Sequence, residues 1–165
     1  MSDEHRLRSR IRLFTSLFII GLVISGVTAI PLRSELAILV GWADHNFHPF
    51  GLRNWLLSVR SALDNTQAHY PFLFYGTDWL AFGHFVIAIA FIGVLRDPVR
   101  NQWLFDFGLI ACALVIPYAL VFGQLRGIPW WWRCIDCSFG ILGAIPLVLC
   151  RKWTHELEML RRDKS

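Results

Sequence analysis

The sequence predicts an all-α polytopic membrane protein with four transmembrane helices and an extracytoplasmic loop that contains an amphipathic helix. Three observations predict this class. Apolar residues make up 55% of the 165 residues and charged residues only 17%, whereas about a quarter of the residues in a soluble domain are charged. Mean hydropathy is +0.47. Four segments are long and apolar enough to cross a bilayer, and this composition excludes disordered, collagen-like and disulfide-stapled secreted proteins.

Each predicted span contains roughly 20 mostly apolar residues, the length that crosses the hydrocarbon core. Pro117 and Pro146 lie inside the third and fourth spans. Neighbouring helices can satisfy the carbonyls that a proline frees, so we expect kinks there rather than helix ends. The spans belong to a single transmembrane domain, residues 1–165, and cover residues 11–30, 79–95, 104–123 and 135–150.

Lys and Arg are unevenly distributed between the loops, and this predicts the orientation. With the N-terminus inside, eleven of the sixteen basic residues are cytoplasmic. We therefore expect a multi-pass protein of the bacterial inner membrane with both termini in the cytoplasm. The basic residues flank spans, which favours contact with anionic membrane lipids and does not indicate nucleic-acid binding. The eleven are Arg6, Arg8, Arg10, Arg12, Arg96, Arg100, Arg151, Lys152, Arg161, Arg162 and Lys164, and the other five are Arg33, Arg53, Arg60, Arg126 and Arg133.

The outer loop, residues 32–78, carries an amphipathic pattern. We expect its second half to form a helix that lies along the outer membrane surface. A short helix is expected at residues 34–43, and residues 153–160 should prolong the fourth span into the cytoplasm. The apolar residues that recur at helical spacing in the second half are Leu52, Trp55, Leu56, Val59 and Leu63.

Polar residues inside or beside the predicted spans are the candidate site, because in lipid each must be paired or hydrated. His84 lies six residues after Asp78, about 9 Å into the second span. The predicted topology gathers six such residues in the outer leaflet, below a belt of tryptophans at 130–132. They form either structural pairs or a polar pocket for a lipid headgroup or a small charged ligand. The six are Asp78, His84, Gln124, Arg126, Arg133 and Asp136.

Two segments carry a motif resemblance. The first is GTDWLAFGHFVIAIAFIG at 76–93, and the second is GQLRGIPWWWRCIDCSFGILG at 123–143. They resemble the two motifs of the VanZ-like family of small four-span envelope proteins. The resemblance implies an envelope-associated membrane protein. The Asp-to-His gap is longer than is usual in that family, and no acidic residue precedes the glutamine of the second segment. The residues that the resemblance assigns to the two motifs are Asp78, His84, Gln124, Arg126 or Arg133, Asp136, Gly140 and Gly143.

Cys134 and Cys137 form a C-x-x-C pair at the predicted outer mouth of the fourth span. Residues i and i+3 of a helix are close enough for a disulfide, and the predicted orientation exposes this pair to an oxidising compartment. The placement is similar to that in the vitamin K epoxide reductase family, which implies a quinone-linked thiol-disulfide oxidoreductase as an alternative function. No cysteine lies in residues 32–78, so a partner protein would supply the substrate thiols. Quinone is a cofactor only under this alternative.

Two further alternatives rest on weaker patterns. Asp44, His45 and His48 could supply zinc ligands, but an interfacial loop rich in Trp, His and Phe produces such spacing easily, so no metal is expected. Gly140 and Gly143 would suit a structural subunit of a membrane complex or a homo-oligomer. The sequence leaves open whether the chain is an enzyme. The favoured function is an integral envelope protein with an outward-facing polar pocket.

Overall fold

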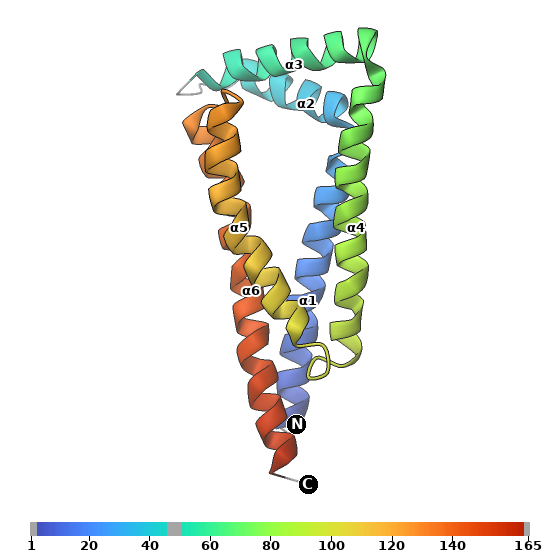
Figure 1. Ribbon diagram of the computed structural model, residues 1–165, viewed down its shortest axis with the longest axis vertical. Coiled ribbons are helices and arrows are strands. Elements are labelled where there is room, and N and C mark those ends of the chain that lie inside the picture. Colours follow the sequence, from blue (N-terminus) through green and yellow to red (C-terminus); the bar gives the residue numbers. More distant parts are fainter. Residues whose placement is uncertain (1–2, 46–50, 164–165) are drawn as a thin grey trace. The chain divides into compact units, whose positions relative to one another are not determined.

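The computed structural model describes residues 3–45 and 51–163, and it confirms the all-α class. Side chains are described throughout these ranges except at residues 44 and 45. The described residues form helices and contain no strand (Figure 1). In chain order the elements are α1 (Asp3–Thr28), α2 (Leu32–His45), α3 (Leu52–His69), the 3-10 helix η2 (Pro71–Phe74), α4 (Tyr75–Arg96), α5 (Trp103–Leu125) and α6 (Trp130–Arg162).

Four helical segments are long and apolar enough to span a membrane: α1, η2 with α4, α5, and α6. The chain is therefore a polytopic membrane protein. α5 continues through Pro117 and α6 through Pro146, so neither proline ends its helix, as predicted. The 33 residues of α6 also confirm the predicted extension beyond the fourth span. α1 begins eight residues before the predicted first span, because the charged segment that precedes the apolar run is helical as well.

The chain divides into two compact units. The first unit comprises Met1–Gly21 and Ala88–Ser165, and the second comprises Leu22–Ile87. α1 and α4 each contribute one part to both units, whereas α5 and α6 belong wholly to the first unit, and α2 and α3 to the second.

In the first unit α5 and α6 lie side by side (Figure 1). Glycines permit this close packing. A Cβ atom on Gly140 of α6 would lie 2.5 Å from the Cys112 carbonyl oxygen of α5, and one on Gly108 of α5 would lie 2.7 Å from Leu147 of α6. Phe91 of α4 is fully buried and also lies against Gly108. Contacts between small residues replace the hydrophobic driving force that a bilayer does not supply.

In the second unit α2 and α3 pack against each other, and the end of α1 packs on α4. The α1–α4 contact is made at Gly26, where a Cβ atom would lie 2.7 Å from the Phe85 ring. Gly51 is the N-cap of α3, and its φ of 73° is left-handed and suits glycine. The predicted amphipathic helix is present, and Leu56, in its second turn, is buried.

Candidate functional site

The connection between α5 and α6 brings two of the predicted arginines onto adjacent helix ends. α5 ends in a Schellman motif, in which the Ile128 amide donates to the Gly123 carbonyl at 2.9 Å. Gly127 has a φ of 69°, the left-handed conformation that this motif requires. Arg126 is therefore the C-cap of α5, and Arg133 lies in the opening turns of α6.

Arg133 lies across the surface of α5. Its methylene groups cover Gly123, where a Cβ atom would lie 2.5 Å from the Arg133 Cδ. Its Nη1 donates to the Leu120 carbonyl at 3.4 Å, which is a long hydrogen bond. Its Nε is buried and has no partner among the described residues. A guanidinium carries five N–H donors, so this group keeps most of its hydrogen-bonding capacity.

Three more predicted residues lie at the end of α5 or in the first turns of α6, and we call the four together the turn site: Gln124, Arg126, Arg133 and Asp136. Asp136 is half-buried, six residues and about 9 Å from the first residue of α6, whereas Gln124 and Arg126 are exposed. Within residues 3–45 and 51–163, no ion pair joins the four, and the side chains of Gln124, Arg126 and Asp136 have no partner. Within the described part of the chain, these four residues therefore do not form structural pairs with one another.

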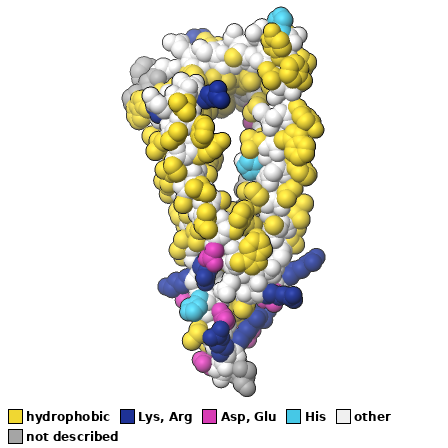
Figure 2. All heavy atoms as spheres, viewed as in Figure 1, with side chains coloured by type: hydrophobic (Ala, Val, Ile, Leu, Met, Phe, Trp, Pro, Cys, Tyr) yellow, Lys and Arg dark blue, Asp and Glu magenta, His cyan; other side chains and the backbone are white. Residues whose placement is uncertain are grey.

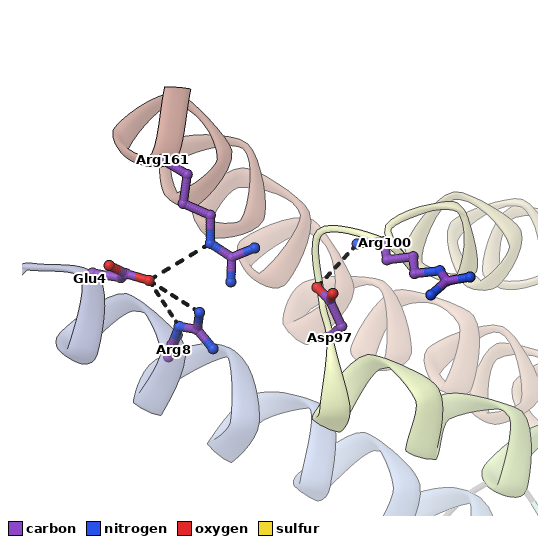
Figure 3. Close-up of polar contacts among 5 residues, drawn as sticks. All are labelled: Glu4, Arg8, Asp97, Arg100 and Arg161. Carbon is purple, nitrogen blue, oxygen red and sulfur yellow. Dashed lines mark hydrogen bonds and ion pairs between the residues drawn. The ribbon is translucent and has the colours of Figure 1, made fainter. Parts of the chain in front are cut away.

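At the opposite end of the same helices five charged residues form ion pairs, and we call these five the charged base. It comprises Glu4, Arg8, Asp106, Arg151 and Arg161. Arg151 Nε of α6 donates to Asp106 Oδ1 of α5 at 2.8 Å. Glu4 Oε1 accepts from Arg8 and forms an ion pair with Arg161 at 3.7 Å, which joins the start of α1 to the end of α6 (Figure 3). Lys and Arg side chains gather at this end (Figure 2).

Sequence reasoning missed the charged base. Asp106 lies inside the predicted third span and Arg151 directly follows the predicted fourth, so two antiparallel spans place them at one level. That signal was available from the sequence.

Sequence reasoning also missed Asn101, whose role is less clearly indicated by the sequence. Its Nδ2 donates to the Gly93 carbonyl at 3.1 Å and to the Asp97 carbonyl at 2.9 Å, which satisfies carbonyls at the end of α4.

Asp78 and His84 lie in α4, in the second unit, whereas the turn site lies in the first. His84 Nδ1 is 2.8 Å from the Leu80 carbonyl oxygen of its own helix. Asp78 lines a shallow cavity of about 230 Å³ with the rings of Tyr75, Trp79 and Phe82. The convergence of these two residues with the turn site remains a prediction.

Cys134 and Cys137 lie in the first turns of α6, as predicted, and both are free thiols. Cys134 is exposed, whereas Cys137 is half-buried and its Sγ donates to the Ile116 carbonyl of α5 at 3.9 Å. The two thiols therefore differ in environment: one points outward and the other contacts the neighbouring helix.

We expect both thiols to be reduced in cells, because Cys134 is exposed whereas Cys137 faces α5, so the two side chains lie in different environments. Cells quenched with acid and treated with maleimide before any reductant should yield full labelling of Cys134 and Cys137. Cys112 provides the internal reference. If Cys134 and Cys137 are labelled only after reduction while Cys112 is labelled without it, the result would contradict this expectation and support the oxidoreductase alternative.

The weak zinc alternative lies largely outside the described residues. His48 is not described, and neither are the side chains of Asp44 and His45. Among the described residues, no group of three His, Cys, Asp or Glu side chains could hold a metal ion.

Gly140 and Gly143 make contacts inside the chain itself. Gly140 faces the Cys112 carbonyl, and a Cβ atom on Gly143 would lie 3.1 Å from the Cys112 Sγ and 3.7 Å from Phe18. The small residues that suggested a partner helix therefore serve the packing of the first unit.

Compared with models of protein families, with curated proteins and with solved structures, the chain gives no match in any of the three.

Proposed function

We propose that this integral membrane protein binds an anionic lipid headgroup, or a small anion of the same phosphate chemistry, at the turn site. One observation carries the proposal. Within the first unit, the five residues of the charged base form ion pairs with one another, whereas at the turn site the buried Arg133 Nε has no partner among the described residues and no ion pair joins the four residues. A buried donor without a partner is costly, and more so near hydrocarbon, so a ligand that supplies acceptors lowers the free energy.

Arg126 and Arg133 are the proposed anion contacts. A guanidinium donates two parallel hydrogen bonds to a phosphate, and the planar group suits that geometry better than a lysine would. Gln124 adds two amide donors, and the Asp136 carboxylate accepts from a hydroxyl or ammonium on the same headgroup. The tryptophans at 130–132 fit the depth of headgroups, where indole rings concentrate.

The proposed setting is the bacterial inner membrane with both termini in the cytoplasm. The support is the charge distribution, because eleven of sixteen basic residues fall on one side in this orientation. The turn site then faces the outer leaflet. This orientation excludes soluble cytoplasmic anions as its ligands.

The proposal predicts weaker binding of phosphatidylglycerol when Arg133 loses its charge. Titration of the purified protein in micelles, followed by native mass spectrometry, should show that Arg133→Gln raises the Kd about tenfold or more, the equivalent of one charge-assisted hydrogen bond. Arg100→Gln is the matched control outside the turn site. Equal affinities of the wild type and Arg133→Gln would contradict the proposal. If inorganic phosphate competes with phosphatidylglycerol, the ligand is a free anion. If it does not compete, the ligand is a lipid headgroup.

A second variant tests the same geometry without changing the charge. An alanine at 123 would push the Arg133 methylenes off α5 and move the guanidinium away from Leu120. We expect Gly123→Ala to weaken phosphatidylglycerol binding as well. Gly21→Ala, at a helical glycine with open space around its Cβ position, is the control. His84→Ala in the same titration tests whether His84 contributes.

A further inference from the structure

α2 has two apolar faces. Leu36, Val40 and Ala43 are buried on one side, at the spacing of one helix face. Ile38, Leu39 and Trp42 recur on another, and Ile38 is 72% exposed. A short helix of a water-soluble hairpin would bury one apolar face and hydrate the other, so the second face of α2 requires a different solvent.

An ion pair joins α2 to α3. Arg33, near the start of α2, turns to Asp64 of α3, with Nη2 at 2.7 Å and Nε at 2.9 Å from Oδ1. Arg60 of α3 lies 3.9 Å from the same carboxylate. The face of α2 that carries Ile38, Leu39 and Trp42 has one charged residue, Glu35, in the first turn of the helix. The exposed side of α3 is polar.

The connections tie this face to the bilayer surface. Three residues separate Thr28, the end of the first span, from Leu32, the start of α2, so the two helix ends lie within about 14 Å. At the start of α4, Tyr75 and Trp79 are exposed, as is Phe72 of η2. Exposed aromatic rings of this kind mark the level of the membrane interface.

We propose that α2 lies in the membrane interface with Ile38, Leu39 and Trp42 among the lipid acyl chains, and that α3 covers it on the water side. The sequence pattern assigned the membrane-contacting role to α3. The structure gives the apolar face of α3 a protein neighbour, since α3 packs on α2 and buries Leu56. Lipid covers the exposed face of α2, because the end of α1 and the start of α4 both enter the bilayer at this level.

The test compares two labelled positions in vesicles of phosphatidylcholine and phosphatidylglycerol. In a variant with the four cysteines replaced, Ile38→Cys or Ser61→Cys carries an NBD fluorophore. Ser61, on the exposed side of α3, is the matched control. We expect NBD at 38 to be quenched by lipids that carry a nitroxide on the acyl chain and to be shielded from aqueous iodide, with the reverse at 61.

Iodide quenching at 38 equal to that at 61 would overturn the proposal. Shielding from both quenchers would overturn it too, because protein rather than lipid, from this chain or a second copy, would then cover the face. The wild-type protein provides a measurement that does not depend on the cysteine-free variant. In vesicles with an acyl-chain diazirine lipid, photolabelling should fall on residues 36–42 and not on 54–65, and the opposite pattern would exclude α2 as the embedded helix.

Discussion

Phe91→Ala should destabilise the protein by about 3 kcal/mol, because it removes a buried ring from the contact between the helices of the first unit. The Phe91 ring is fully buried, and its centroid lies 4.8 Å from that of Phe18 on α1. It also lies against Gly108 of α5. In soluble cores Phe→Ala costs about 3–5 kcal/mol. We expect the lower end here because the lost contacts are van der Waals contacts and lipid offers similar ones to the unfolded chain.

The measurement is reversible unfolding in mixed micelles of increasing SDS content. Ile89→Ala provides the control on the same helix, since Ile89 is 65% exposed. We expect that variant to unfold close to the wild type. A Phe91→Ala protein as stable as Ile89→Ala would show that the first unit is not packed as described.

Gly140→Leu should prevent the close approach of α5 and α6. A Cβ atom at 140 would already collide with the Cys112 carbonyl, and a backbone oxygen cannot turn aside as a side chain can. Gly140→Ala should therefore cost about 1–3 kcal/mol, the usual range for overpacking, and the larger leucine should cost more. We expect a lower Tm for the alanine variant and little folded protein for the leucine variant.

The matched control is Gly83→Ala, because the space around a Cβ atom at 83 is open. In that setting alanine is the better helix former by roughly 1 kcal/mol, so Gly83→Ala should keep or raise the Tm. A Gly140→Ala protein with an unchanged Tm would mean that α5 and α6 do not meet at this glycine.

The sequence predicted the spanning helices well because their signal is strong and local. About 20 apolar residues have one stable conformation in lipid, and this fixed the four spans, including the continuation of α5 through Pro117. The partner of α3 could not be predicted in the same way. Its apolar stripe is satisfied equally by lipid or by another helix, and only the fold shows that α2 fills that role.

The candidate site was predictable in part. Gly127, which follows the end of α5, and the short connection to α6 predict that residues 124–136 lie together, and four of the six candidate residues fall there. Asp78 and His84 lie in α4, about 40 residues before the turn site in the sequence. Their distance from the turn site depends on helix packing, which no local sequence pattern encodes. Pairing of Asp106 with Arg151 follows from antiparallel spans, but it requires the register of two helices to be known.

The chain has four helices that can span a membrane. The central proposal is the topology predicted from the charge distribution, with both termini in the cytoplasm and the loop of residues 32–78 outside. Single cysteines at Ser9, Ser61 and Glu156, in the variant with the four native cysteines replaced, test it most directly through labelling with an impermeant maleimide. In spheroplasts only position 61 should react, and in inverted vesicles only 9 and 156. Labelling of 9 and 156 from opposite sides, or recovery of the protein in the soluble fraction, would contradict the account.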